Sequence, residues 1–178
     1  MTEGTFIEGG TARIRPLEQV DARRLAAGFA RHGWHKPVET FDGYLDEQRR
    51  GARACYLAEV DGVIAGYCTL LWESPYQPFR AGGIPEIADL NVLPPFRCRG
   101  IGSALLDAVE SAAKDRSAVV GLGVGLYADY GTAQRLYVRR GYVPDGRGVM
   151  YEYRTVEPCE SIPIDDDATL MMTRTLRD

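Results

Sequence analysis

The sequence predicts a single α/β domain with a mixed central sheet of about seven strands flanked by four helices. Two strand-like runs, 54–60 and 63–72, are joined by Asp61-Gly62, a dipeptide typical of tight β-hairpin turns. A strand, a glycine-rich loop, a helix and a second strand follow between residues 84 and 127, which is the order of a βαβ unit. A hairpin that leads into a βαβ unit indicates one mixed sheet with helices packed on it.

The other elements follow from the spacing of apolar residues. Apolar residues from 101 to 112 recur at helical spacing, which predicts an amphipathic helix. The run 118–127 is almost entirely apolar, which is typical of a buried strand parallel to a neighbour. The remaining predicted elements are helices at 20–31, 40–50 and 130–140, strands at 11–17, 84–93, 148–156 and 168–176, and loops at 32–37, 74–83 and 157–167. Residues 1–10 are expected to be a flexible lead-in, so the domain is predicted to cover 11–178.

Length and charge limit the possible functions. The 178 residues are enough for one compact domain and few for two, and 45% hydrophobic with 26% charged residues is ordinary for a globular protein. The net charge of -4 and the pI near 5.3 argue against a nucleic-acid partner, whose binding draws on clustered positive charge. An acidic chain leaves room for a cationic substrate.

Metal, membrane and export functions are not predicted. The four cysteines and two histidines show no metal-ligand spacing, so we expect no metal site. No run of about 18 apolar residues indicates a membrane span. The first residues lack a basic region followed by an apolar one, which argues against a signal peptide. We therefore expect a cytoplasmic protein with free thiols.

The loop "RCRGIG", from Arg97 to Gly102, has the chemistry of an anion site. Amides at the start of a helix lack intrahelical acceptors, the helix dipole adds positive potential, and glycines let the backbone approach a bulky anion. The chain has no GxxxxGK[ST] string, so a P-loop is not predicted. The GxGxxG fingerprint also fails, because its third glycine falls on Leu105 or Leu126.

Three segments together resemble the GNAT superfamily of acyl-CoA-dependent N-acetyltransferases. The pattern R-x-x-G-x-G between a strand and a helix is similar to the family's pyrophosphate loop. The preceding "EIADLNV" resembles the strand that binds the pantetheine arm. The later "AQRLYVRRGY" is similar to the family's A-x-x-L-Y-x-x-x-G-[FY] helix. The resemblance covers about 63–143 and implies a GNAT-like fold.

The resemblance implies a site for acetyl-CoA, used as a cosubstrate without a metal. Loop amides of Cys98 to Ser103 would hold the pyrophosphate, and the strand backbone around Leu90 to Val92 would hold the pantetheine. Arg97 and Arg99 would either add charge to the loop or remain solvated. The full set of expected cofactor-binding residues is Leu90, Asn91, Val92, Arg97, Cys98, Arg99, Gly100, Ile101, Gly102 and Ser103.

The resemblance also implies two catalytic residues. Tyr137 matches the tyrosine that protonates the departing thiolate, although a tyrosine on a helix face can also be a core residue. Glu86 matches a glutamate that some relatives use as general base; the alternative is a carboxylate without a proton-transfer role. An alkyl amine is mostly protonated at pH 7, so some group must take its proton. Asp89 would point to the opposite face of a regular strand, and a bulge would change that.

Two positions depart from the family pattern. The strand 118–127 carries no carboxylate, which narrows the general base towards Glu86. Tyr130 stands where many relatives have an asparagine that contacts the CoA arm, so it either replaces that contact or packs. A covalent acyl-enzyme on Cys98 is disfavoured because no histidine is evident nearby and a pyrophosphate loop lies far from the acetyl group.

The expected reaction is transfer of an acetyl group from acetyl-CoA to an amine by direct attack in a ternary complex. A non-catalytic acyl-CoA-binding module, a transferase for another acyl group and a nucleotide-binding protein are the alternatives. The amine acceptor is not identified, and a homodimer is possible because many relatives form one. Candidates for lining the acceptor site are Trp34, His35, Trp72, Tyr76 and Phe79.

Overall fold

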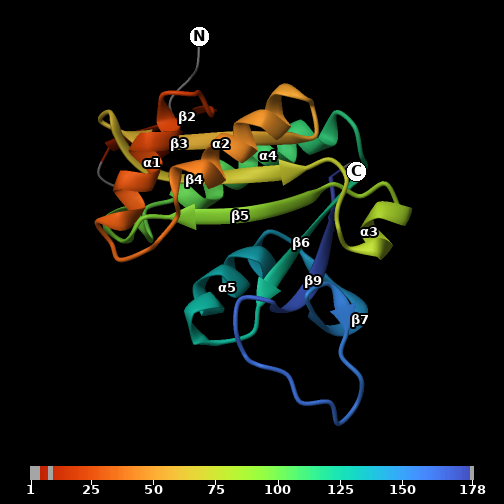
Figure 1. Ribbon diagram of the computed structural model, residues 1–178. Coiled ribbons are helices and arrows are strands. Elements are labelled where there is room, and N and C mark those ends of the chain that lie inside the picture. Colours follow the sequence, from red (N-terminus) through yellow and green to blue (C-terminus); the bar gives the residue numbers. More distant parts are fainter. Residues whose placement is uncertain (1–4, 8–9, 177–178) are drawn as a thin grey trace. The chain divides into compact units, whose positions relative to one another are not determined.

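The computed structural model describes residues 5–7 and 10–176, and the predicted α/β class with a mixed sheet is confirmed (Figure 1). The strands are β1 (Thr5–Ile7), β2 (Gly10–Pro16), β3 (Arg53–Val60), β4 (Val63–Leu71), β5 (Glu86–Val92), β6 (Val119–Gly125), β7 (Val143–Tyr151), β8 (Arg154–Thr155) and β9 (Ala168–Thr175). The helices are α1 (Asp21–Ala30), α2 (Val38–Arg49), α3 (Gln77–Ala81), α4 (Ile101–Lys114) and α5 (Gly131–Arg139), with short 3-10 turns η1 (Pro94–Phe96) and η2 (Ala128–Tyr130).

The described chain has nine strands and five α-helices, where about seven and four were expected. Thr5–Ile7, inside the expected lead-in, pairs with β2, while residues 1–4 and 8–9 of that lead-in lie outside the described residues. The predicted strand 148–156 is a hairpin, because Glu152 and Tyr153 have φ values of 49° and 64° and turn the chain between β7 and β8. The predicted loop 74–83 contains α3, which has a proline in its first turn, where proline is well tolerated.

The chain divides into two compact units, and the extent of a single domain from 11 to 178 stays a prediction. The first unit contains residues 1–72 and 88–112, and the second contains 73–87 and 113–178. In the first unit the strand order is β1-β2-β3-β4-β5. In the second, Glu86 and Ile87 of β5 pair in parallel with Gly121 and Leu122 of β6, as predicted for a βαβ unit, and the order continues β6-β9-β7-β8.

An aromatic core holds α1 and α2 against the sheet of the first unit. The ring of Phe29 on α1 lies 5.5 Å from that of Tyr67 on β4 and 6.3 Å from that of Phe41 on α2, centroid to centroid. All three side chains are buried, and burying large rings is a major source of stability. α4 lies behind the opposite face of the same strands (Figure 1). This packing fixes β4 and β5, on which part of the predicted site lies.

A buried charge network fastens the start of α1 to β2 and β3. Asp21 is fully buried and receives Arg15 Nη1 at 2.6 Å and Arg24 Nη1 at 2.9 Å. Both arginines also contact Glu59 of β3, at 3.1 and 2.9 Å. Burial alone would raise the pKa of Asp21, but the hydrogen bond and charge of Arg15 outweigh it and the pKa is lowered. The network therefore stabilises the fold while these carboxylates stay ionised.

In the second unit a smaller core forms around α3. Tyr76 and Phe79 are buried together with Met150 of β7 and Met171 of β9. A Cβ on Gly121 would lie 2.1 Å from the ring of Phe79, so only glycine leaves room for this ring in its present position over β6. Tyr76 and Phe79, two of the five candidates for lining the acceptor site, are thus core residues of this unit.

Candidate active site

The glycine-rich loop has the geometry of an anion cradle. It follows η1 and leads directly into α4, whose first turn closes with a bond from Ala104 N to Gly100 O at 3.0 Å. Gly100 has a φ of 87° and Cys98 a φ of 58°, both left-handed, and the two residues are exposed. Ile101 is buried, so its side chain anchors the helix while its amide remains at the helix start. The helix amides before Ala104, those of Ile101 to Ser103, have no acceptor within the helix, which suits a phosphate group.

The two arginines of the loop lie against aromatic rings. Arg97 donates from Nε to Val92 O at 3.1 Å, and its guanidinium lies 5.0 Å from the ring of Trp34. The guanidinium of Arg99 lies 5.8 Å from the ring of Phe96. Arg97 therefore connects the end of β5 to the loop between α1 and α2, and its role with a phosphate stays a prediction.

The backbone of β5 changes its surroundings along its length. Glu86 and Ile87 form its ladder with β6, whereas Leu93 N, just beyond the strand, bonds to Ala65 O of β4 at 2.8 Å. A Cβ on Gly66 of β4 would lie 2.3 Å from Asn91 O, so glycine allows the two backbones to approach closely. The predicted pantetheine-binding residues, Leu90 to Val92, lie on this later part of β5, and that role remains untested.

Asp89 interrupts the regular strand. Its φ is 58°, so the alternation of side chains is broken at this residue and the expectation for a regular strand does not apply. Lys36 Nζ at 2.7 Å and Asn91 Nδ2 at 2.8 Å donate to Asp89 Oδ1. The hydroxyls of Tyr44 and Tyr67 each donate to Oδ2 at 2.6 Å. We call these five residues the Asp89 centre; all belong to the first unit.

The charges of the Asp89 centre determine its protonation. Burial alone would raise the pKa of Asp89, but the positive charge of Lys36 and the side-chain donors outweigh it, and the pKa is lowered. Burial, followed by the negative charge of Asp89, raises the pKa of Tyr67 and of Tyr44 well above the usual range. At neutral pH the centre therefore holds an ionised carboxylate and two neutral phenols.

Glu86, the expected general base, is a buried carboxylate of the second unit. Only 3% of the residue is exposed, and it accepts hydrogen bonds from Ser74 Oγ and, at 3.1 Å, from the hydroxyl of Tyr153. Ser74 is itself fixed by the amide of Tyr76 at 2.9 Å. Tyr153 lies at the left-handed turn between β7 and β8, and 41% of the residue is exposed. Its hydroxyl therefore links the buried carboxylate of Glu86 to a side chain that reaches the surface.

Tyr137 lies in α5, and Tyr130 directly precedes that helix. Tyr137 is 7% exposed, and its ring contacts that of Tyr142 edge-on at 5.7 Å. Tyr130 fills the space over Gly125, where a Cβ would lie 2.4 Å from its ring, and its hydroxyl donates to Asp166 at 2.9 Å. Tyr130 therefore packs and binds the 157–167 loop, which is one of the two roles expected for it.

Three functional candidates were missed by sequence reasoning, namely Lys36, Tyr44 and Tyr67. Lys36 lies in the predicted loop 32–37, directly after the acceptor candidates Trp34 and His35. Nothing in its position along the sequence links it to Asp89. Trp34 is half-buried against Phe29, and His35 is exposed. The aromatic core around Tyr67 brings these segments together.

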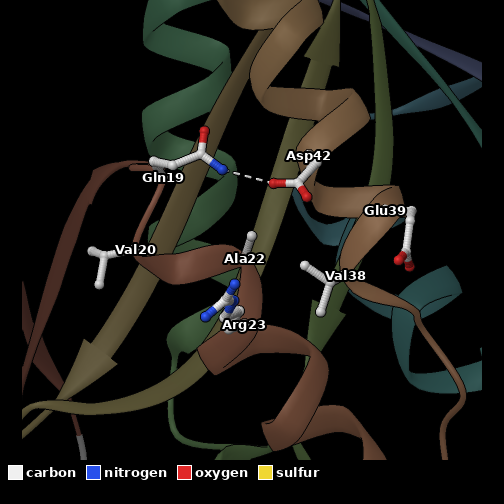
Figure 2. Close-up of a pocket in the computed structure, with 7 residues that line it drawn as sticks. All are labelled: Gln19, Val20, Ala22, Arg23, Val38, Glu39 and Asp42. Atoms are coloured by element: carbon white, nitrogen blue, oxygen red, sulfur yellow. Dashed lines mark hydrogen bonds between the residues drawn. The ribbon is translucent and has the colours of Figure 1, made fainter.

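One groove of the first unit lies apart from the predicted site residues. Figure 2 shows a groove between the first turns of α1 and α2, lined by Gln19, Val20, Ala22, Arg23, Val38, Glu39 and Asp42. Gln19 donates to Asp42 at 2.7 Å, and none of the predicted site residues lines the groove. Within residues 5–7 and 10–176, no three His, Cys, Asp or Glu side chains are grouped as metal ligands. None of the helices in this part of the chain combines the length and apolar character needed to cross a bilayer.

Comparison with known proteins identifies the family. The sequence profile described as "Acetyltransferase (GNAT) family" matches residues 19–142, which is more than half of the chain. The chain belongs to the GNAT acetyltransferase family. A comparison with curated protein sequences gives no match. The family assignment makes the chain a member of an acyltransferase family with a fold that binds acetyl-CoA and an acceptor.

Solved structures of this GNAT fold resemble the chain at low identity. An N-acetyltransferase from Staphylococcus aureus Mu50 has a TM-score of 0.68 at 17% identity, covering 93% of this chain and 99% of that one. A ribosomal-protein-alanine N-acetyltransferase from Brucella melitensis has a TM-score of 0.66 at 20% identity, covering 91% and 98%. The Salmonella typhimurium protein yncA, solved with its cofactor acetyl-CoA, has a TM-score of 0.66 at 16% identity, covering 94% and 95%. At these identities the likeness concerns the fold alone.

Proposed function

We propose that this protein is an N-acetyltransferase that transfers the acetyl group of acetyl-CoA to an amine by direct attack in a ternary complex. The observation that carries the proposal is the loop before α4. Its left-handed Cys98 and Gly100 expose the backbone directly before the first helical turn, which fits the binding of a pyrophosphate. The family membership and the acetyl-CoA-bound relative support the same donor.

The chain's own residues would act mainly by positioning. Acetyl-CoA supplies an activated acyl group as a thioester. The amides of Cys98 to Ser103 would bind its pyrophosphate, and the backbone of Leu90 to Val92 would orient its arm. Holding two reactants in a near-attack geometry accounts for a large part of the rate enhancement of such transfers.

Two side chains would move protons. A phenol ordinarily has a pKa of about 10, so the hydroxyl of Tyr137 would donate to the thiolate that leaves. Glu86 would take the amine proton, directly or through water. Its bond to the hydroxyl of the partly exposed Tyr153 supports a path by which this proton would leave Glu86 for the surface of the second unit.

The decisive experiment measures CoA binding to Gly100→Val. A side chain at this left-handed position strains the loop and occupies the space of the phosphate, so the Kd for CoA should rise at least about tenfold. Gly51→Val is the matched control, because Gly51 also has a positive φ, of 72°, and lies between α2 and β3, where a Cβ would meet no heavy atom within 4 Å. An unchanged Kd in Gly100→Val would contradict the loop assignment.

A second experiment separates the enzyme from a binding module. The wild-type protein is incubated with acetyl-CoA and a panel of primary amines, and CoA release is followed. The proposal predicts turnover with at least one amine and a lower kcat in Tyr137→Phe. Tight CoA binding without turnover across the panel would instead support a non-catalytic acyl-CoA-binding protein.

A further inference from the structure

The carboxylate of the Asp89 centre is fully engaged. Two donors, Lys36 and Asn91, reach Oδ1, and two others, Tyr44 and Tyr67, reach Oδ2. An ionised carboxylate offers about four lone-pair positions, so the four bonds saturate it. A further donor can bind Asp89 only if one of these four side chains leaves.

Lys36 is the donor that is free to exchange. Tyr67 is buried and its ring is fixed by edge contacts with Phe29 and Phe41. Tyr44 is half-buried on α2, and its ring is held between the edge contact with Phe41 and the guanidinium of Arg53. Asn91 lies on the same strand as Asp89 and also donates to the Asp89 carbonyl at 3.1 Å. Lys36, in contrast, lies in the loop between α1 and α2, its side chain is 26% exposed, and its ammonium is carried on a flexible four-carbon stem.

The surroundings of the Lys36 ammonium recognise a primary ammonium group. Besides Asp89, Nζ lies 2.8 Å from the Tyr67 hydroxyl and 5.5 Å from the centre of the Tyr67 ring. A carboxylate and a phenolic oxygen, both at hydrogen-bond distance, accept N–H groups of the same ammonium. Bonds of 2.7 and 2.8 Å require N–H donors, so a quaternary ammonium would not fit.

The position of this centre relates it to the donor site. Asp89 directly precedes Leu90 to Val92, the backbone proposed to orient the acyl-CoA arm. Arg97 connects the same strand end to Trp34, two residues before Lys36. An ammonium bound at Asp89 would thus lie on the strand that we propose to hold the arm of acetyl-CoA. Asp89 and Leu90 to Val92 belong to the same unit of the chain.

We propose that the Asp89 centre is the binding site for the acceptor's ammonium group and that Lys36 is an internal competitor that occupies it until an acceptor displaces it. The acceptor class is a primary amine on an unbranched alkyl chain, because such a group has the stem of lysine and can repeat the bonds of Lys36 Nζ to Asp89 and Tyr67. This inference rests on the proposed function for the fate of the bound amine, but binding of the amine itself is independent of acetyl-CoA.

The test uses n-butylamine, which matches the Lys36 side chain from Cβ to Nζ, and the variant Lys36→Ala. Without acetyl-CoA, calorimetric titration should show butylammonium binding to Lys36→Ala at least tenfold more tightly than to the wild type. Binding should be lost in the double variant Lys36→Ala/Asp89→Asn. Lys114→Ala removes a lysine at the end of α4 and should behave like the wild type, and tetramethylammonium should bind none of the four proteins at this site.

A second variant keeps the test decisive if Lys36→Ala does not fold. Lys36→Gln retains a neutral donor for Asp89 and competes less strongly than an ammonium, so it should also bind butylammonium more tightly than the wild type. Equal binding by wild type and Lys36 variants, or binding that survives Asp89→Asn, would overturn the proposal.

Turnover distinguishes this inference from the proposed function. With acetyl-CoA present, Lys36→Ala should acetylate butylamine with a KM at least tenfold below that of the wild type. Tighter amine binding without CoA release would support the ammonium site and contradict the enzyme. Turnover of amines whose KM is unchanged by Lys36→Ala would support the enzyme and overturn the ammonium site.

Discussion

Glu86 and Asp89 lie three residues apart on β5, yet their carboxylates are held in different ways. Glu86 belongs to the regular ladder with β6, is buried, and accepts from the hydroxyls of Ser74 and Tyr153. Asp89 has a left-handed backbone, is 23% exposed at its side chain, and holds the ammonium of Lys36. Asp89 thus holds a partly exposed cation, whereas Glu86 is shielded from solvent and bound by two hydroxyls. This difference agrees with the two roles that we propose, an ammonium site at Asp89 and a proton acceptor at Glu86.

The largest change in the free energy of unfolding is expected from Gly66→Ala, where β4 approaches the part of β5 that carries Asp89. The new Cβ would lie 2.3 Å from Asn91 O, a backbone atom that moves only with β5, so the free energy of unfolding should fall by about 3 kcal/mol. Gly121→Ala, beside Glu86, meets the side chain of Phe79 and should cost less, since a ring can shift where a backbone cannot. Denaturant unfolding measures both changes.

The control for these substitutions is Gly43→Ala. Gly43 lies inside α2, where a Cβ meets no heavy atom within 4 Å, and alanine should stabilise the helix by up to about 1 kcal/mol. A loss in Gly66→Ala no greater than in Gly121→Ala would show that the β4–β5 approach is not the tighter constraint.

The next largest effect is expected from Asp89→Asn. The amide loses the charge that attracts Lys36 and can accept at one oxygen only, so the free energy of unfolding at pH 7 should fall by about 1–3 kcal/mol. Glu86→Gln should cost less, because an amide can still pair with the hydroxyls of Ser74 and Tyr153. Equal losses in the two variants would remove the stability difference between the two carboxylates.

The pH dependence of Asp89→Asn sharpens the comparison. The pKa of Asp89 is lowered in the folded protein, so its stabilisation is present above the unfolded value of about 4 and is lost as the pH falls through the folded pKa. The difference in unfolding free energy between wild type and Asp89→Asn should therefore shrink below pH 4. Asp21 and Glu59, whose pKa values are also lowered, contribute equally to both proteins. A difference that grows on acidification would contradict the ion pair.

The smallest effect on stability is expected from Tyr153→Phe. The hydroxyl makes one bond to Glu86 from a partly exposed ring, so the loss should be at most about 1 kcal/mol. If Glu86 is the general base, removing a donor to its ionised form should raise its kinetic pKa, and the acid limb of the kcat/KM profile should shift to higher pH. An unchanged profile in Tyr153→Phe and in Glu86→Gln would show that another group takes the proton.

Sequence reasoning succeeded where the information was local. The apolar spacing of 101–112 predicted α4 and the Asp61-Gly62 turn predicted the β3–β4 hairpin, because both patterns act within a few residues. The β7–β8 hairpin was missed because its turn residues, Glu152 and Tyr153, lack the glycine or asparagine that usually marks a left-handed turn.

The Asp89 centre was missed for a different reason. Its residues come from a loop, α2, β4 and β5, and Lys36 is 53 positions from Asp89. Their meeting depends on the packing of the aromatic core and on a left-handed residue within a strand, neither of which leaves a periodic pattern. The positions of the glycine loop and of Tyr137 were accessible from the family resemblance, while their roles stay predictions.

The short strands at the two ends of the sheet order bear on self-association. β1 has three residues and β8 has two, so each offers few unpaired amides and carbonyls on which another chain could add a strand. Short outer strands are a recognised protection against edge-to-edge aggregation. A second copy that added a strand directly onto β1 or β8 would therefore gain only a few ladder hydrogen bonds.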